Sequence, residues 1–428
     1  MKSRIHPAWF VAVAAFVALI GAAGFRATPS VLIQPLNEEF GWSLGTISAA
    51  VSVNLLLYGL TAPFAAALMD KFGIRRVAMG ALLLVSAGSG LTLWMSQSWQ
   101  LMLCWGVLVG LGTGSLALGF VATITGRWFV RHRGLVTGVL TAGGATGNLI
   151  FLPVLAQLTQ SHGWRTAALT VSVAALAVVP LIWWRLRDHP ADLGVTAFGG
   201  TIAAERPAKP AGGAARNALS ALRDAARTRP FWLLAGGFAI CGATTNGLVG
   251  THFIPAAHDH GMPQTTAAGL LALVGIFDIA GTIASGWLTD RVDSRILLGA
   301  YYALRGLSLL VLPSLFAATA HPSMLVFILF YGLDWVATVP PTVTLCREYF
   351  GERGAVVFGW VFASHQFGAA VAATAAGLVR DRLGEYTFAW YGAGALAILA
   401  SILSLMLFAG KRLKPVAPGI GLAVPTGR

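Results

Sequence analysis

Long apolar runs, separated by short polar segments, make up almost the whole chain. A helix that crosses a bilayer needs about 20 apolar residues, and twelve runs come close to that length or exceed it. They occupy residues 8–36, 43–69, 77–96, 99–126, 134–158, 164–186, 230–257, 265–289, 295–317, 323–346, 354–379 and 386–410. The pattern therefore predicts an all-α membrane protein with twelve transmembrane helices.

The polar segments between these runs repeat at a single offset of 220 residues. Asp70-Lys71 returns as Asp290-Arg291, Arg75 as Arg295, Arg127 as Arg347, and Arg133-Gly134 as Arg353-Gly354. A duplicated polar framework predicts two six-helix bundles in tandem, related by pseudo-two-fold symmetry. Transporters that rock about a central site are built from such repeats.

One long polar interruption divides the chain at residues 187–229. It contains Pro190, Pro207 and Pro210, which is typical of a linker. We expect an N-terminal bundle at 1–186, a cytoplasmic linker at 187–229, a C-terminal bundle at 230–410 and a disordered cytoplasmic tail at 411–428. The end of the linker, from Asn217 to Thr228, is predicted to form an amphipathic helix on the membrane surface, with the linker passing beneath the bundle and leaving the halves free to move.

Charge defines the expected topology. Only 11% of the residues are charged and the formal net charge is +13, whereas soluble domains carry about 25% charged residues. Most Lys and Arg residues fall in cytoplasmic segments if the N-terminus is inside. We therefore expect a protein of the inner (plasma) membrane with both termini cytoplasmic. We also expect it to be a monomer. The positive charge then faces anionic lipid, and no nucleic-acid partner is predicted.

Several chemistries are excluded. Cys104, Cys241 and Cys346 all lie in predicted spans and form neither a disulfide framework nor a metal pattern. The sequence His258-Asp259-His260 is read as a solvated loop. No phosphate-binding loop, nucleophile elbow or dinucleotide-binding glycine pattern occurs in a suitable context. The chain is therefore predicted to be no enzyme and to use no metal or cofactor, so that an ion or substrate gradient supplies the energy.

The duplicated loops are candidates for gating. Asp70 ends the second span, where a carboxylate is unfavourable at the negative end of its own helix and needs a positive partner such as Arg127. The same reasoning pairs Asp290 with Arg347. The alternative is a plain positively charged loop. The predicted gating residues are Asp70, Arg75, Arg76, Arg127, Asp290, Arg291 and Arg347.

These loops resemble those of a known family. The stretch from Asp70 to Arg76 resembles the loop signature of the major facilitator superfamily, and Arg127-Trp128-Phe129 with Arg133-Gly134 resembles its companion. The second copy is degenerate, since Asp293 stands where Gly73 stands in the first. The resemblance implies alternating access around a midplane cavity lined by helices 1, 4, 7 and 10.

A finer resemblance points to one branch of that family. The segments 30–36 and 39–43, with Phe277-Asp278, resemble the monocarboxylate and oxalate/formate transporter-like proteins. Monocarboxylate carriers typically place an Arg one turn after this Asp, where the present sequence has Thr282.

Four charged residues lie at bilayer depth: Arg26, Asp278, Arg305 and Asp334. Such residues are costly there and usually functional. Arg305 and Asp278 are predicted to form either a structural ion pair or a proton-coupling pair. Asp334 is predicted to be a proton or cation site or, alternatively, to pair with Arg305 or with a neighbouring helix.

Arg26 is the expected anchor for an anionic substrate, because a guanidinium suits a carboxylate. The alternative is that it snorkels to the outer headgroups. Weaker candidates for the substrate site are the uncharged polar residues Asn54, Tyr58, Asn246, His252, Tyr331, His365 and Gln366, each of which could instead form an interhelical hydrogen bond.

The sequence thus predicts a secondary active transporter that moves a small mono- or dicarboxylate, with Asp278, Arg305 and Asp334 coupling transport to proton symport. A proton-antiport exporter of drugs or metabolites is the first alternative. A membrane sensor is the second, although the linker and tail offer no signalling domain.

Overall fold

The computed structural model describes residues 5–200, 214–289 and 291–409, and these are almost entirely helical. Twelve helices or helix series among them are long and apolar enough to cross a membrane, and their ends agree with the predicted spans within about five residues. The first six run as α1 (Pro7–Phe40), α2 (Leu44–Phe72), α3 (Ile74–Leu91), the series α4 (Ser98–Leu101), α5 (Gly110–Ser115) and α6 (Leu118–Trp128), then α7 (Arg133–His162) and α8 (Trp164–Arg185). After α9 (Ala214–Ala225) come α10 (Arg229–Gly242) with α11 (Gly250–Asp259), α12 (Gln264–Thr289), α13 (Ser294–Val311), α14 (Pro322–Asp334) with α15 (Val339–Phe350), α16 (Gly354–Leu383) and α17 (Thr387–Leu405).

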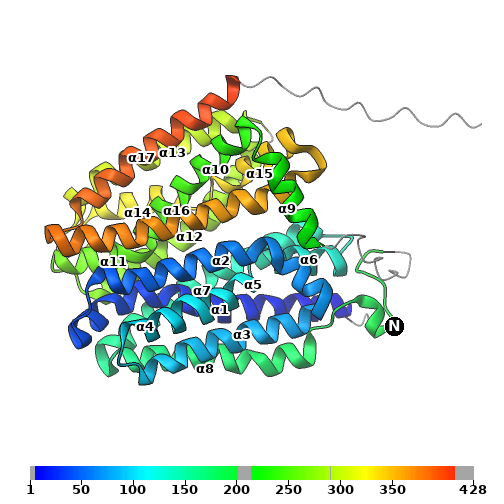
Figure 1. Cartoon of the computed structure of the whole chain (residues 1–428), viewed down its shortest axis with the longest axis horizontal. Helices are drawn as coiled ribbons and strands as arrows, with labels where there is room; N and C mark the ends of the chain where they lie inside the picture. The colour runs from blue at the N-terminus through cyan, green and yellow to red at the C-terminus, as the bar shows by residue number, and fades with distance from the viewer. Residues whose placement is uncertain (1–4, 201–213, 290, 410–428) are drawn as a thin grey trace, which may run out of the picture.

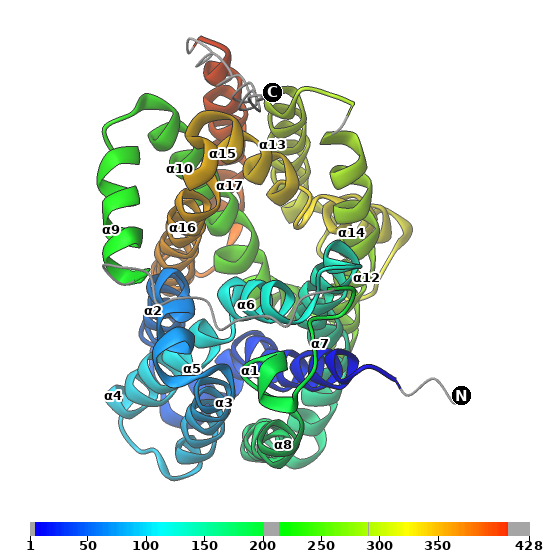
Figure 2. The ribbon, with the colours of Figure 1, turned by 90° about the vertical axis from the view of Figure 1, so that its right-hand side faces the viewer.

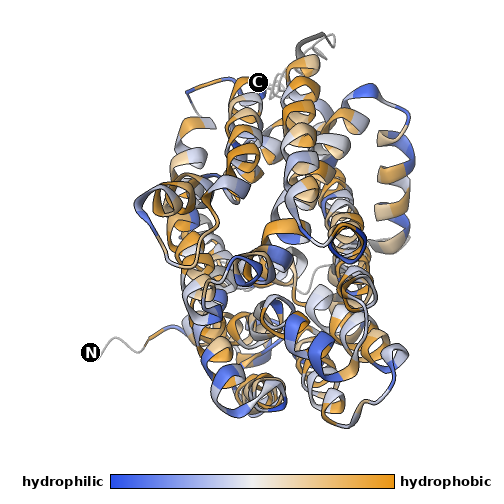
Figure 3. Cartoon of the chain, turned by 90° about the vertical axis from the view of Figure 1, so that its left-hand side faces the viewer, coloured by the Kyte–Doolittle hydropathy of each residue, from blue (hydrophilic) through white to orange (hydrophobic). Residues whose placement is uncertain are grey.

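These helices form two bundles, α1–α8 and α10–α17, which lie one above the other (Figures 1 and 2). α1 begins and α17 ends at the same end of the molecule, here named the termini face, and the opposite end is named the far face. Viewed from the far face, hydrophilic residues gather in the connections between helices, while hydrophobic residues dominate the helices (Figure 3). The predicted all-α fold with pseudo-two-fold symmetry is confirmed.

Each bundle contains one span that breaks at the same register. In the fourth span, α5 ends at Ser115 and α6 begins at Leu118; in the tenth, α14 ends at Asp334 and α15 begins at Val339. The two breaks lie 220 residues apart, like the polar loops. Broken helices at matching positions of two repeats are typical of substrate and ion sites in transporters.

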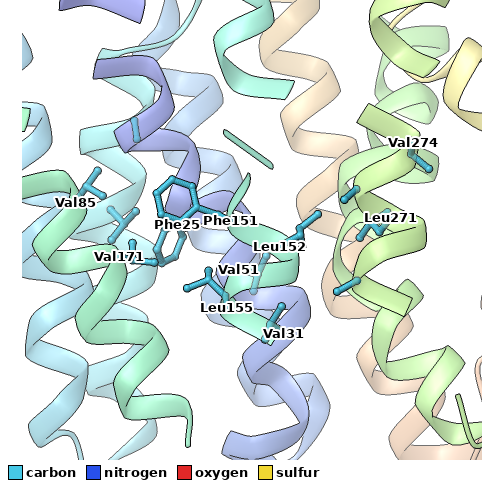
Figure 4. Close-up of a cluster of buried hydrophobic side chains, with 14 of the residues drawn as sticks. Phe25, Val31, Val51, Val85, Phe151, Leu152, Leu155, Val171, Leu271 and Val274 are labelled. Atoms are coloured by element: carbon cyan, nitrogen blue, oxygen red, sulfur yellow. The ribbon is translucent and has the colours of Figure 1, made fainter. Parts of the chain in front are cut away.

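The buried apolar residues form two clusters. The first fills the N-terminal bundle and continues into the far-face part of the C-terminal bundle, where it includes Phe253 of α11, Val274 of α12, Tyr331 of α14 and Trp390 of α17. Figure 4 draws part of it, with Phe25 of α1 beside Phe151 of α7, and Leu271 and Val274 on α12. The second cluster is confined to the termini-face part of the C-terminal bundle. A continuous apolar core therefore joins the two bundles at the far face.

Glycines allow the helices of the C-terminal bundle to approach closely. A Cβ added to Gly281 of α12 would lie 1.8 Å from the carbonyl oxygen of Leu333 on α14, so no side chain fits there. Gly286, on the same helix, has no heavy atom within 4 Å of such a Cβ.

Gly281→Ala is therefore expected to push α12 from α14 and to lower the free energy of unfolding by about 1–3 kcal/mol. Thermal unfolding of the purified protein in detergent measures this, with Gly286→Ala as the matched control that leaves the melting temperature almost unchanged. Equal melting temperatures for the two variants would contradict the close packing.

The interruption after α8 is bound to the N-terminal bundle rather than loose. The Asp188 carboxylate accepts from the main-chain N–H of Arg75 at 2.9 Å. Phe198 forms a bridge with Phe129, donating its N–H to the Trp128 carbonyl at 2.9 Å, and its ring packs against those of His6, Trp9, Phe129 and His132. Residues 186–200 thus pack across the termini face of this bundle. The sequence did not indicate this packing.

The second part of the interruption contains the expected amphipathic helix. α9 contacts α2 as well as α16, where the Trp360 indole N–H donates to the Ala218 carbonyl at 2.9 Å. Arg353, in the turn just before α16, pairs with Asp224 of α9 at 2.5 Å. Residues 201–213 and the predicted tail at 411–428 lie outside the described residues.

Candidate transport site

Arg26 of α1 points towards α2 and α7, two helices that contact the C-terminal bundle. Its Nη2 donates to the Tyr58 hydroxyl of α2, and its guanidinium carbon lies 4.8 Å from the centroid of the Tyr58 ring. A Cβ at Gly144 of α7 would lie 3.4 Å from Arg26 Nη1. Both α2 and α7 pack against the C-terminal bundle, through α16 and α12. Arg26 is exposed, and no carboxylate of the described residues pairs with it.

Tyr58 connects Arg26 to α16. Its ring lies 5.9 Å from that of Phe362, and Phe362 stacks on His365 with centroids 5.8 Å apart. Gln366 contacts the adjacent turn of α2, since a Cβ on Gly59 would lie 2.6 Å from Gln366 Cβ. The buried atoms His365 Nδ1 and Gln366 Oε1 have no hydrogen-bond partner among the described residues. The structure therefore brings Arg26 and Tyr58 into direct contact and places Gln366 beside α2, whereas His365 packs against Phe238 of α10, with ring centroids 4.9 Å apart.

The other predicted substrate residues lie elsewhere. Asn54 donates to the Trp105 carbonyl at 2.8 Å, and the Tyr331 hydroxyl donates to the Thr244 carbonyl at 2.7 Å. His252 is completely buried near the far face, with Nε2 2.8 Å from the Ala373 carbonyl oxygen. The alternative interpretation, an interhelical hydrogen bond, fits these three. Asn246 is half-buried in the π-helical segment Ala243–Val249.

Arg305 pairs with Asp334 rather than with Asp278. Its Nε donates to Asp334 Oδ2 at 2.5 Å, and its Nη2 donates to the Asp334 carbonyl at 2.6 Å. Nη1 lies 2.9 Å from the Cys241 sulfur on α10. The guanidinium thus joins three spans and covers main-chain carbonyls that the break after α14 leaves without helical donors. Of the predicted alternatives for Asp334, pairing with Arg305 is the one found.

Asp278 lies on the other side of the same break. Its Oδ1 accepts from the Thr282 hydroxyl at 3.0 Å and from the main-chain N–H of Val336 at 3.1 Å. Ser285, farther along α12, donates to the Ala337 carbonyl at 2.5 Å. The Arg305 guanidinium at the end of α14 matches the negative end of that helix, and the Asp278 carboxylate accepts from a main-chain N–H inside the break. No cation of the described residues forms a salt bridge with Asp278.

The predicted gating residues are only partly placed. The Asp70 side chain and residue Asp290 lie outside the described part. Arg127 contacts the linker, with Nη1 3.4 Å from the Asp188 carbonyl oxygen and 3.3 Å from His189 Nε2. Arg291, in the turn after α12, lies over the ring of Trp287 on that helix, with 4.0 Å between its guanidinium carbon and the ring centroid. Arg76 and Arg347 are exposed.

The repeated residue Arg295 anchors the second loop instead of Arg347. It is buried and forms salt bridges with Asp293, at 2.9 Å, and with Glu348. Its Nε also donates to the Tyr349 hydroxyl at 3.2 Å. The 220-residue repeat indicated Arg295 itself, but its partner Glu348 has Trp128 at the matching position of the first repeat and so could not be found by the repeat.

The fold, the matching helix breaks and the duplicated loops agree with a comparison against protein families. The model of the Major Facilitator Superfamily matches residues 13–373. The chain belongs to the Major Facilitator Superfamily. It is therefore a multi-pass membrane transporter and not an enzyme.

Similar proteins include members of the branch that the sequence resembles. An uncharacterized MFS-type transporter of Bacillus subtilis, YcxA, is 26% identical, with 96% of this chain and 98% of that protein covered. Monocarboxylate transporter 13 of Rattus norvegicus is 27% identical, with 92% of this chain and 87% of that protein covered.

Solved structures share the fold. A bacterial homologue of the human lysosomal transporter Spinster, inward-facing and occupied, has a TM-score of 0.73 at 14% identity, covering 95% of this chain and 98% of that one. A D-xylose-proton symporter has a TM-score of 0.71 at 14% identity, covering 92% of this chain and 97% of that one.

Proposed function

We propose that this superfamily member carries a small mono- or dicarboxylate by alternating access, in symport with protons. The observation that carries this proposal is Arg26, an exposed guanidinium at bilayer depth without a carboxylate partner among the described residues. A charged residue at bilayer depth is costly unless it is paired, and a carboxylate substrate would neutralise it. The relatives named monocarboxylate transporters support the same substrate class.

The proposed orientation places the termini face in the cytoplasm of a cell with this protein in its inner (plasma) membrane. Of the Lys and Arg residues that the structure describes, most lie on the segments of that face, as the positive-inside rule requires. Because the apolar core joins the bundles at the far face, this orientation makes the described state closed to the outside. A substrate would then leave towards the cytoplasm.

The substrate would bind against Arg26 between the bundles. The Tyr58 ring supports the guanidinium from one side, which fixes its plane and leaves the N–H groups that Tyr58 does not use for a carboxylate. On the opposite bundle, His365 Nδ1 and Gln366 Oε1 are buried in the described state and have no partners of their own among the described residues, so they would reach a substrate only after the bundles move. A ligand that contacts both bundles would favour the state in which they approach one another.

Asp278 is the proposed proton carrier. Protonating Asp334 would leave Arg305 as a buried unpaired cation, which is strongly unfavourable. Asp278 has two neutral donors, Thr282 and Val336, and can therefore gain a proton without leaving a buried cation unpaired. Since Val336 lies in the break of the tenth span, a change of charge on Asp278 would act directly on that broken segment.

Asp278→Asn is therefore expected to remove proton coupling while keeping the binding site. Uptake into proteoliposomes with an imposed pH gradient should accumulate a labelled carboxylate for the wild type but only equilibrate it for the variant. Exchange between substrate inside and outside should continue in the variant, because exchange needs no net proton movement.

Thr282→Val is the matched control, because it removes one donor to Asp278 but keeps the carboxyl group and should keep accumulation. Normal accumulation by Asp278→Asn would exclude Asp278 as the carrier. If the wild type instead expelled substrate against an inward proton gradient, the exporter hypothesis would replace symport.

A further inference from the structure

The far face carries a polar contact that crosses from one bundle to the other. Asp381, in the last turn of α16, accepts from two main-chain N–H groups at the start of α2: Leu44 N donates to Oδ1 at 2.9 Å and Gly45 N donates to Oδ2 at 2.7 Å. The next N–H, of Thr46, is capped by the Ser43 hydroxyl at 3.1 Å. The α2 N-terminus is thus capped partly by its own residue and partly by the other bundle.

The local sequence is built for this approach. A helix N-terminus carries partial positive charge and free N–H groups, so a carboxylate is a favourable partner. A Cβ on Gly45 would lie 2.7 Å from Leu378 Cδ2 and 3.0 Å from Asp381 Oδ2. Only glycine at this position lets the two helices and the carboxylate come this close.

A second contact crosses the same face. Pro35 has no N–H, so the carbonyl of Val31, four residues earlier in α1, lacks its helical donor. Gln264, the first residue of α12 in the other bundle, donates Nε2 to this carbonyl at 2.6 Å. Gln264 and Pro35 also line a small pocket of about 90 Å³ between the bundles.

The described salt bridges at the far face stay within one bundle. Arg165 of α8 pairs with Glu39 of α1 at 2.6 Å, inside the N-terminal bundle. Arg380 of α16 pairs with Asp259 of α11 at 2.7 Å, inside the C-terminal bundle. These two pairs stay intact when the bundles rotate as rigid bodies, whereas the contacts of Asp381 and Gln264 must break.

We propose that Asp381 and Gln264 form a far-face latch, and that they are gating residues of the transport cycle. Each caps a main-chain group of the opposite bundle that would otherwise lack a partner. Opening of the far face leaves two amides of α2 and the Val31 carbonyl uncapped, so the latch sets the balance between the two states. The latch rests on the proposed alternating access but not on the identity of the substrate.

Electron-spin distance measurements test the latch without any substrate. Spin labels at Ser161→Cys, at the exposed far-face end of α7, and Thr319→Cys, in the exposed far-face loop before α14, report the separation of the bundles. Asp381→Ala is expected to raise the ratio of open to closed populations about tenfold, the size of a lost helix cap. Asp381→Asn, which keeps the shape but not the charge, should shift it less.

Gln264→Ala should shift the ratio in the same direction, and the double variant further. The matched control is Asp259→Asn, which removes a neighbouring carboxylate of the same face whose pair lies inside one bundle, and which should leave the distances as in the wild type. Unchanged distances in Asp381→Ala, or an equal shift in Asp259→Asn, would overturn the latch. A shift confined to the latch variants supports it even if carboxylates prove not to be transported.

Discussion

Arg26→Gln is expected to lower kcat/KM for carboxylate uptake by roughly 100-fold. Losing one partner of a desolvated charge pair costs about 2–5 kcal/mol, and each factor of ten in rate corresponds to about 1.4 kcal/mol. Initial rates of labelled carboxylate uptake into proteoliposomes measure the effect. Arg26→Lys keeps the charge but not the planar fork, and it should fall between the wild type and the glutamine variant.

The melting temperature of Arg26→Gln distinguishes a residue that binds the substrate from one that stabilises the fold. Because no carboxylate of the described residues pairs with Arg26, Arg26→Gln should leave the melting temperature unchanged or raise it. Arg165→Gln, which breaks the exposed pair with Glu39 at the far face, serves as the control and should retain uptake. A glutamine variant at position 26 that folds and transports like the wild type would remove Arg26 from the site.

The twelve spans could be predicted because a bilayer sets one length for every helix and leaves charged residues for the loops. The 220-residue repeat added the two bundles, since Asp70-Lys71 and Asp290-Arg291 mark equivalent turns. The breaks inside the fourth and tenth spans were missed. Their signals were present as Gly110, Gly112 and Gly114 before one break and Pro340-Pro341 after the other, but both spans remain apolar across the break.

The residues of the site could be predicted, but which of them contact one another was harder to predict. The sequence places Asp278, Arg305 and Asp334 at similar depth, but the rotation of each helix decides which pair forms, and apolar neighbours on all sides leave that rotation undefined. Arg26 and Tyr58 could be selected by residue type, whereas their contact requires α1 and α2 to present them to each other. Asp381 escaped notice because its partners are main-chain amides, which no side-chain pattern reveals.

The second large effect is expected at Arg305, the buried cation that joins three spans of the C-terminal bundle. Arg305→Met removes the charge and leaves the Asp334 carboxylate unpaired. It also leaves the Asp334 and Trp335 carbonyls, exposed by the helix break, without their donors. Breaking a buried pair from one side costs about 3–5 kcal/mol, so the variant should melt well below the wild type in detergent.

A double-mutant cycle decides whether the lost stability comes from the unpaired Asp334 carboxylate. Adding Asp334→Asn to Arg305→Met removes the unpaired charge, and the double variant should therefore regain part of the lost stability. The recovery should be incomplete, because the main-chain carbonyls at the break remain uncapped. Arg291→Met, at an exposed arginine in the turn after α12 that donates to the Trp287 carbonyl of that helix, is the control and should have the melting temperature of the wild type. If Arg305→Met alone has the melting temperature of the wild type, the guanidinium does not stabilise the broken span. The proposal that Asp334 has a structural role and Asp278 carries the proton would then lose its basis.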